Sequence, residues 1–320
     1  MRLIWITWET QRRNRSLSNA LDAKLFEITS NSSRPLRYIK SIKKTRQLIK
    51  QENPDVIFAQ NPSLILSCYI ILWRKLSKVS PRIVLDYHNA GVYPTNGKEL
   101  SQWAAKNADA VLVTNKQLAN VIQGWGAKPI IVPDFLPKLH TPTTTQKPSS
   151  KDINVLFICS WSEDEPIREV VTATEILAKQ HSIAVHITGK PKVKAYLGDT
   201  TIPKSVILTG FLPEQDFDNL IHNSDLIIDL TTRDNCMVCG AYEAVAAGVP
   251  ALLSDNEATR NYFQSGMEFT DNTAGDIAEK IDKMIKNRKQ YKDEIEELKN
   301  ELKKKQLDVV EKIIKEVQPA

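Results

Sequence analysis

The stretch from Leu226 to Ser254 constrains the fold more than any other part of the chain. It begins with an apolar run, Leu226 to Leu230, which has the composition of a buried parallel strand. A short polar loop follows, and then a helix of small residues is predicted from about Cys236 to Ala247. Gly248-Val249-Pro250 ends this helix, because glycine takes the left-handed cap and proline cannot continue a helix. The apolar run Ala251 to Ser254 then completes a βαβ unit.

The start of this helix is predicted to bind a ligand. Helices of open α/β sheets begin at the carboxyl end of a strand, which is where their ligands bind. The N–H groups of the first turn, near Cys239 and Gly240, are expected to hold an anion such as a phosphate. Further along the helix, the carboxylate of Glu243 can accept hydrogen bonds from a ribose diol. The alternative, a solvated Glu243, is disfavoured by its small apolar neighbours.

The run GAYEAVAAGVPALLSD, from Gly240 to Asp255, resembles the nucleotide-sugar signature of GT-B glycosyltransferases of the family 4 type. That signature has two glutamates eight positions apart, followed by Gly-x-Pro. Glu243 matches the second glutamate, which in the family binds the ribose of the nucleotide. The first glutamate, which contacts the donor sugar, falls on Asn235. The resemblance therefore implies a catalytic position for Asn235, whose amide can donate and accept hydrogen bonds but carries no charge.

The alternation of apolar strands and helices runs twice along the chain. We expect an α/β fold with two Rossmann-like, doubly wound domains, at 1–136 and 152–287. Residues 137–151 are rich in proline, threonine and serine, which is typical of a linker. Residues 288–320 are charge-dense with apolar residues at helical spacing, and predict a C-terminal helical segment. The resemblance implies that this helix crosses back onto the first domain, and a coiled coil or a membrane-lying helix is the alternative. The resemblance implies the GT-B architecture, in which the two domains face a central cleft.

Further donor-binding residues are predicted in the loops that follow strands of the second domain. They are Trp161, Gly189, Lys190 and Phe211. Family 4 enzymes usually hold the donor diphosphate with an Arg and a Lys in the loop after the first strand of this domain. Here that loop, Ser160 to Pro166, is acidic and has neither residue, so Lys190, Arg168 or the helix start is expected to replace them. Phe211 can stack on the base or can belong to the core.

A catalytic pair is predicted at the end of the strand Arg82 to Leu85. Asp86 can orient His88, and an Asp and a His at the carboxyl end of a strand indicate a site. Related transferases carry a similar Asp-x-His that faces the acceptor, so the resemblance gives both residues a catalytic role. The alternative is a buried, hydrogen-bonded histidine.

The loop after the first strand is the predicted acceptor site. It carries Trp8, Arg12 and Arg13 where many nucleotide-binding domains have glycines. Arginine pairs bidentately with phosphate, so this loop can clamp an acceptor phosphate or pyrophosphate. The alternative is a solvated basic helix start, which is unfavourable beside the positive end of a helix dipole.

Composition excludes several classes of function. The net charge of +5 is too small to indicate nucleic-acid binding. Cys236-x-x-Cys239 has no second ligand pair at zinc-site spacing, so no metal site is predicted. No signal peptide or membrane span is apparent, which predicts a cytoplasmic protein. A basic amphipathic helix is predicted from Pro35, and its apolar face comprises Leu36, Ile39, Ile42, Leu48 and Ile49. It is typical of a plain surface helix and leaves open a peripheral contact with the inner face of a membrane.

The sequence therefore predicts a metal-independent glycosyltransferase of the hexosyltransferase type that needs no cofactor. It would transfer a sugar from a nucleotide sugar to a polysaccharide or glycolipid acceptor, with retention of anomeric configuration if it follows family 4. Two alternatives stay open. One is a nucleotide-sugar epimerase of the same fold. The other is a non-catalytic partner subunit, suggested by Asn235 and the missing Arg/Lys pair. The sugar, base, acceptor, linkage and oligomeric state do not follow from the sequence.

Overall fold

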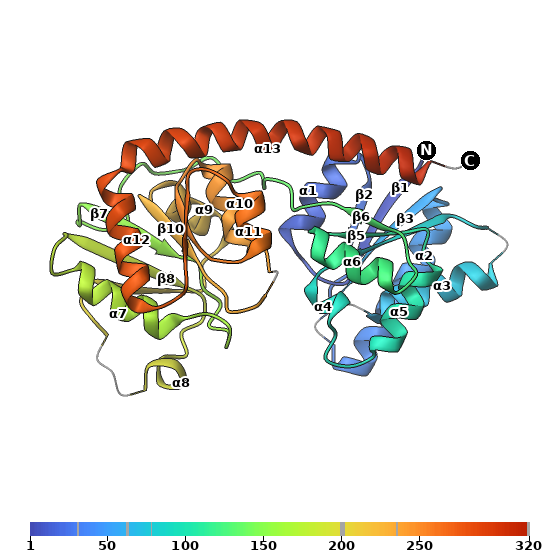
Figure 1. The fold of residues 1–320 in the computed structure, drawn as a ribbon. Helices are drawn as coiled ribbons and strands as arrows, with labels where there is room; N and C mark the ends of the chain where they lie inside the picture. Colours follow the sequence, from blue (N-terminus) through green and yellow to red (C-terminus); the bar gives the residue numbers. More distant parts are fainter. Residues whose placement is uncertain (31, 62–63, 78, 199–201, 235, 319–320) are drawn as a thin grey trace. The chain divides into compact units, whose positions relative to one another are not determined.

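The chain folds into two compact units, each built on a six-stranded parallel sheet. The computed structural model describes residues 1–30, 32–61, 64–77, 79–198, 202–234 and 236–318. The first unit comprises Met1–Phe135 with Lys304–Ala320, and the second comprises Leu136–Lys303. Each sheet has helices on both of its faces (Figure 1). The α/β class and the two Rossmann-like halves expected from the sequence are thus confirmed.

The first sheet has the strand order β2-β1-β3-β4-β5-β6. Its strands are β1 (Leu3–Thr7), β2 (Lys24–Glu27), β3 (Val56–Asn61), β4 (Arg82–Tyr87), β5 (Ala110–Val113) and β6 (Pro129–Ile131). The helices of this unit are α1 (Arg12–Ala20), α2 (Arg34–Glu52), α3 (Leu64–Leu76), α4 (Asn89–Val92), α5 (Lys98–Asn107) and α6 (Lys116–Gly124). Neighbouring strand residues alternate between two cores. For example, Ile57 joins the core under α3, α5 and α6, whereas Phe58 joins the core under α1.

The second sheet has the strand order β12-β11-β10-β7-β8-β9. Its strands are β7 (Ile153–Phe157), β8 (Ile183–Thr188), β9 (Val206–Gly210), β10 (Leu226–Asp229), β11 (Ala251–Ser254) and β12 (Met267–Thr270). Its helices are α7 (Ile167–Leu177), α8 (Val193–Leu197), α9 (Glu214–His222), α10 (Cys239–Ala247), α11 (Glu257–Tyr262) and α12 (Ala274–Lys286). One face packs on α7 and α12, and the other packs on α9 and α10. The helix expected from about Cys236 begins at Cys239, because Val238 before it has an extended backbone.

The last helix, α13 (Arg288–Val317), contributes apolar residues to a hydrophobic core of each unit. Its apolar residues Ile295, Leu298 and Leu302 are buried in the second unit, and Ile313 and Val317 are buried in the first. The charge-dense segment at 288–320, predicted as a helical segment, therefore holds buried residues of each unit.

Residues 137–151 contain no helix or strand and are hydrogen-bonded to α9 within the second unit. The backbone N–H of His140 donates to Asp218 Oδ2 at 2.9 Å, and that of Thr143 donates to Asn219 Oδ1 at 2.9 Å. Among the described residues, no helix has the length and apolar character needed to cross a bilayer.

Candidate functional site

The start of α10 is built around a buried carboxylate at the end of β10. The backbone N–H of Gly240 donates to Asp229 Oδ2 at 2.7 Å. A Cβ at position 240 would lie 2.4 Å from that oxygen and 2.7 Å from Ile158 Cδ1, so any larger residue would force these side chains or the helix start to shift. This finding corrects the prediction that Gly240 binds a ligand phosphate, because its N–H is already used by the chain's own carboxylate. Glu243, one turn further along α10, is also buried.

Asp229 lies among other acidic groups. Burial raises the pKa of Asp229 well above its usual range, the hydrogen bond from Gly240 opposes the rise, and the charges of Glu243, Glu165 and Asp164 add to it. The protonated form of Asp229 is therefore favoured more strongly than in an exposed aspartate. The region where family 4 enzymes carry an Arg and a Lys is acidic in the folded protein as well as in the sequence.

The loop after β7 is folded around Glu165. The Glu165 carboxylate accepts hydrogen bonds from the backbone N–H groups of Ser160 at 2.9 Å and Ser162 at 2.7 Å. It also accepts from Ser160 Oγ at 2.9 Å and from Cys159 Sγ at 3.3 Å. Burial, together with Glu165, raises the pKa of the Cys159 thiol far above its usual range. These loop N–H groups are directed at an internal carboxylate, as the N–H of Gly240 is.

Trp161 in this loop is a core residue, which corrects its assignment as a donor-binding side chain. Its ring is fully buried, and its Nε1–H donates to the carbonyl oxygen of Thr188 at 2.9 Å. The ring packs edge-on against Tyr196 at a centroid distance of 6.0 Å. Burial on this scale leaves no face of the ring for a nucleotide.

Arg233 and Asp164 form an ion pair beyond the end of β10 that the sequence analysis missed. Arg233 Nη2 lies 2.8 Å from Asp164 Oδ1, and Thr231 Oγ1 donates to Asp164 Oδ2 at 2.7 Å. The Arg233 side chain remains 61% exposed. Its place in the loop after an apolar strand was the available signal, since the carboxyl ends of parallel strands meet at one edge of the sheet.

The remaining predicted donor residues also follow strands of this sheet. Gly189, after β8, has a φ of +83°, and a Cβ there would lie 2.2 Å from the carbonyl oxygen of Cys159, so the position requires glycine. Lys190 is exposed. Phe211, after β9, is 86% exposed, which excludes the core alternative. Cys239 is exposed at the first position of α10, and Asn235 lies outside the described residues.

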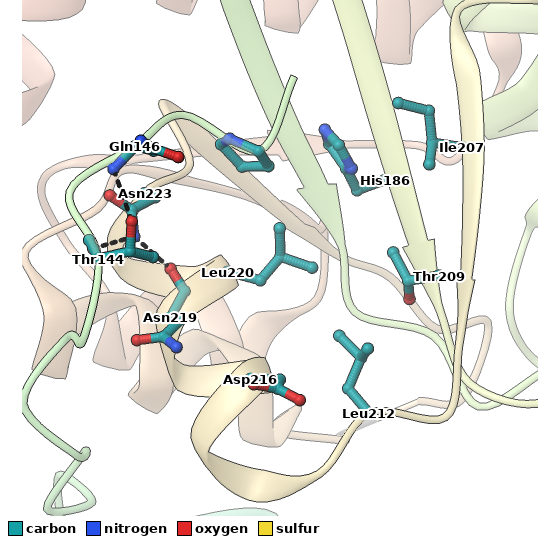
Figure 2. A pocket seen from close by; sticks show the side chains of 11 residues that line it. Thr144, Gln146, His186, Ile207, Thr209, Leu212, Asp216, Asn219, Leu220 and Asn223 are labelled. Atoms are coloured by element: carbon teal, nitrogen blue, oxygen red, sulfur yellow. Dashed lines mark hydrogen bonds between the residues drawn. The ribbon is translucent and has the colours of Figure 1, made fainter.

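A hollow of about 340 Å³ lies beside β8, β9 and α9. Figure 2 shows Leu212 and Leu220 on one side and His186 and Thr209 on the other. None of the predicted site residues lines it, although Thr209 and Leu212 flank the Gly210-Phe211 pair. Among the described residues, no group of His, Cys, Asp and Glu side chains is arranged to hold a metal ion.

In the first unit, Asp86 is held by a buried arginine. Arg13 Nε lies 3.0 Å from Asp86 Oδ2, and Arg13 Nη2 lies 2.7 Å from Asp86 Oδ1. Arg13 also bonds to Asp134 through Nη1 and to the carbonyl oxygen of Val132 at 3.0 Å. Its side chain is 3% exposed, which corrects the prediction that it binds an acceptor phosphate. Asp134 was not foreseen, and its signal was again its position after a strand, β6.

This arrangement places an ionised carboxylate beside His88. Burial alone would raise the pKa of Asp86, but the charge of Arg13 and the interactions with His88 outweigh it and hold that pKa well below its usual range. His88 Nε2 lies 3.5 Å from Asp86 Oδ2, and the His88 side chain is 27% exposed. Asp86 therefore lies where it can orient the imidazole, and the imidazole remains accessible.

The loop after β1 is fixed by polar contacts. Trp8 Nε1–H donates to Thr45 Oγ1 of α2 at 3.1 Å, and the Trp8 ring lies 6.1 Å from that of Tyr38. Arg12 is half-buried at the start of α1. A buried network beneath the loop was not foreseen. In it, Asn14 Nδ2 and Thr7 Oγ1 both donate to Gln60 Oε1 at 2.8 Å.

Two protein families match this chain, and together they cover most of it. Residues 144–301 match the family described as "Glycosyl transferases group 1", and residues 10–133 match "Glycosyltransferase Family 4". No match was found among curated protein sequences.

Solved structures with the same fold have low sequence identity to this chain. HepE from Anabaena, crystallised with UDP, has a TM-score of 0.68 at 12% identity, over 99% of this chain and 99% of that chain. Sucrose-phosphate synthase from Thermosynechococcus elongatus has a TM-score of 0.69 at 12% identity, over 98% of each chain. A putative UDP-N-acetylglucosamine 2-epimerase from Listeria monocytogenes has a TM-score of 0.61 at 13% identity, over 92% of this chain and 91% of that chain. At these identities the likeness establishes the fold, and the family matches establish the kinship: the chain belongs to the GT-B glycosyltransferases of the group 1, family 4 type.

Proposed function

We propose that this protein transfers a hexose from a nucleotide sugar to a polysaccharide or glycolipid acceptor, with retention of anomeric configuration and without a metal ion or cofactor. The observation that carries the proposal is Glu243. It matches the ribose-binding glutamate of the family signature, and it is buried in α10 beyond the carboxyl end of β10, at the edge where α/β sheets bind their ligands. HepE, which has the same fold, has been crystallised with UDP-glucose, which supports a nucleotide-sugar donor.

In the second unit, Glu243 would accept hydrogen bonds from the ribose diol and Phe211 would stack on the base. Lys190 and Arg233 would supply the positive charge that the missing Arg/Lys pair provides elsewhere in the family. Protonation of Asp229, favoured by its raised pKa, would remove one negative charge from the neighbourhood of the phosphates.

In the reaction, the bond from the anomeric carbon to the diphosphate breaks and a bond to the acceptor oxygen forms. The acceptor proton leaves with the departing phosphate. Stabilisation of the charge that develops on the diphosphate would supply most of the acceleration. In the first unit, His88, oriented by Asp86, would hydrogen-bond the acceptor, and Trp8 and Arg12 would help to bind it.

The proposal is tested by thermal shift with UDP, GDP, ADP, dTDP and their sugars, without metal. A ligand that binds only the folded chain must raise its melting temperature. One responding base is expected. Glu243→Ala should weaken that response by at least about tenfold in affinity, since two hydrogen bonds to a charged group are lost. Glu279→Ala, on the exposed face of α12, is the matched control and should respond like the wild type. Equal affinities in the two variants would remove Glu243 from the site.

A second candidate function is a non-catalytic partner of a glycosyltransferase. The carboxylates of Asp229 and Glu165 accept hydrogen bonds from N–H groups of the helix start and of the loop after β7. This candidate is favoured because those N–H groups are then not available to a donor phosphate. This candidate predicts no thermal response to any nucleotide sugar. The third possibility, an epimerase, would convert a responding nucleotide sugar when no acceptor is present, which product analysis would detect. A cytoplasmic location is part of the proposal.

A further inference from the structure

Exposed apolar side chains are concentrated in one part of the first unit. Fourteen large apolar residues are exposed among the described residues, and eight of them lie between residues 36 and 100. These eight are Leu36, Ile39, Ile65, Leu72, Leu76, Val79, Tyr93 and Leu100. Single exposed apolar residues are ordinary, but a concentration of them on neighbouring elements indicates a binding surface.

Five of these residues lie at one edge of the first sheet. Leu36 and Ile39 are in the first two turns of α2, Ile65 and Leu100 are in the first turns of α3 and α5, and Tyr93 directly follows α4. In a parallel sheet, a helix that connects two strands starts at their carboxyl edge, so all five belong to the edge that carries His88. We call this set the apolar rim.

The elements of the rim are neighbours. Helices α3 and α5 lie side by side in Figure 1, and a Cβ on Gly97, just before α5, would lie 2.8 Å from Leu64 of α3. Helix α2 packs against α3 in turn. Through Tyr38, α2 also contacts Trp8 in the loop after β1. The rim therefore adjoins the predicted acceptor residues of the same unit.

The exposure of Leu36 and Ile39 corrects an expectation from the sequence, where helical spacing grouped them with Ile42, Leu48 and Ile49 on one apolar face. In the structure, Leu36 is 53% exposed and Ile39 is 63% exposed. The buried positions of α2 are Ser41, Thr45 and Ile49. Thr45 accepts the hydrogen bond from Trp8, and Leu36 and Ile39 lie outside this buried stripe of α2.

Helix α2 also has a strong excess of positive charge. It contains seven basic residues and one acidic residue, whereas α13 contains nine basic and eight acidic residues. Six basic side chains of α2 are exposed, and among the described residues none of the six forms an ion pair: Arg37, Lys40, Lys43, Lys44, Arg46 and Lys50. On α12, by contrast, Lys280, Lys283 and Lys286 each lie within 4 Å of a carboxylate. The positive charge of α2 is therefore not balanced locally.

We propose that the apolar rim and the cations of α2 bind the surface of an anionic lipid bilayer. Apolar side chains that protrude from a basic helix enter the boundary between head groups and acyl chains, and lysines around them reach the anionic head groups. Such binding would place the edge that carries His88 against the bilayer, which favours a lipid-linked acceptor over a soluble polysaccharide. This choice of acceptor rests on the proposed function; the binding of the bilayer does not.

The test is flotation of the full-length chain with vesicles of phosphatidylcholine, either alone or mixed with phosphatidylglycerol. Binding is expected to the mixed vesicles and to be much weaker with phosphatidylcholine alone. Raising the salt concentration should weaken it, because charges at the surface are screened. Failure to float with anionic vesicles, or equal binding to both kinds, would overturn the proposal.

Two pairs of variants locate the surface. Replacement of Lys40, Lys43 and Lys44 by Gln should weaken binding by at least about tenfold. The same replacement of the exposed residues Lys289, Lys303 and Lys304 removes equal charge from α13 and should leave binding unchanged. Leu36→Ser/Ile39→Ser should also weaken binding, whereas the matched control, Leu307→Ser/Ile176→Ser, should not.

All of these positions are exposed, so the variants are expected to fold. If an α2 variant and its matched control lost vesicle binding equally, the binding would be general electrostatic or apolar adhesion. That result would overturn the assignment of the membrane-binding surface to α2. The vesicle assay uses no nucleotide, and the nucleotide assay uses no lipid. Loss of membrane binding and failure of the proposed sugar transfer are thus separate results.

Discussion

Each sheet carries a buried aspartate near the carboxyl end of a central strand, and the pKa values of these two aspartates are shifted in opposite directions. Asp86 of β4 is paired with Arg13, and its pKa is held far below the usual range. Asp229 of β10 has one backbone N–H from Gly240 and three acidic neighbours, and its pKa is raised. The first unit thus keeps a buried negative charge and neutralises it, whereas the second unit favours the neutral acid.

This difference separates two kinds of site. A carboxylate that is locked by an arginine is a rigid acceptor of hydrogen bonds, suited to orienting the neighbouring His88. A carboxyl group that can take up a proton near a proposed phosphate site can change its charge when an anion arrives. Three substitutions, each with a control at a similar position, test this difference between the two units.

Arg13→Met should have the largest effect. It leaves Asp86 and Asp134 buried without their cation, and loss of one partner of a buried pair typically costs about 3–5 kcal/mol. Arg15→Met, two residues along the same helix, changes a side chain that is 45% exposed and pairs with Glu27. That control should cost at most about 1 kcal/mol. Urea unfolding of both variants checks the difference, and similar costs would mean that the Arg13 pair adds no more than a surface ion pair.

Gly240→Ala should have the next largest effect. Its Cβ would lie 2.4 Å from Asp229 Oδ2, so the helix start must shift or the hydrogen bond must break, at a cost of about 1–3 kcal/mol. Gly275→Ala in α12 is the control, since a Cβ there meets nothing within 4 Å. It should stabilise by about 0.5–1 kcal/mol, because alanine loses less entropy in a helix. In the double variant with Asp229→Ala, the cost of Gly240→Ala should shrink; an unchanged cost would place the strain elsewhere.

Asp229→Asn should have a smaller effect, with a sign that depends on pH. Because the folded pKa of Asp229 is raised, its contribution to stability is fully present below the ordinary pKa of about 3.9 and is lost as pH rises through the folded value. Asparagine keeps an acceptor for Gly240 and carries no charge. The variant should therefore be more stable than the wild type at neutral pH, and the advantage should fade as pH falls toward 4.

The control for this pH dependence is Asp255→Asn. Asp255 lies just after β11, and a hydrogen bond from Arg260 lowers its pKa. Its contribution is present above the ordinary pKa and is lost as pH falls, so the control should be slightly less stable than the wild type at neutral pH. Denaturation midpoints measured from about pH 4 to pH 7.5 would reveal the two signs. If both variants shifted in the same direction, the contrast drawn for Asp229 would be wrong.

Much of the fold could be predicted because it depends on local patterns. The apolar run Leu226 to Leu230 and the stop at Gly248-Val249-Pro250 are explained by burial and backbone geometry within a few residues. The structure has β10 and the end of α10 at these places. The closeness of Asp86 and His88, two positions apart at a strand end, could be foreseen for the same reason.

The partners of the charged residues could not be predicted in this way. Arg13 meets Asp86 and Asp134 across 73 and 121 positions of sequence, and a basic loop gives no sign of whether its arginines face inward or outward. Trp161 was misassigned for a similar reason, because its loop is polar in sequence while its ring fills the core. Leu36 and Ile39 have the spacing of a buried face, but the side of α2 that is buried carries Thr45, whose hydrogen-bond partner Trp8 lies 37 positions away in the sequence.

Short stretches of residues determine the alternation of strands and helices along the chain, the small-residue helix and the family signature. These local features were enough to predict the fold class and the kinship. Charge states and exposures were decided only in the tertiary structure. Whether a carboxylate meets an arginine, as Asp86 does, or a single N–H among other acids, as Asp229 does, depends on segments far apart in sequence. Electrostatic energies depend on the distance between charges and on their burial, and both are set only when those segments come together in the folded chain.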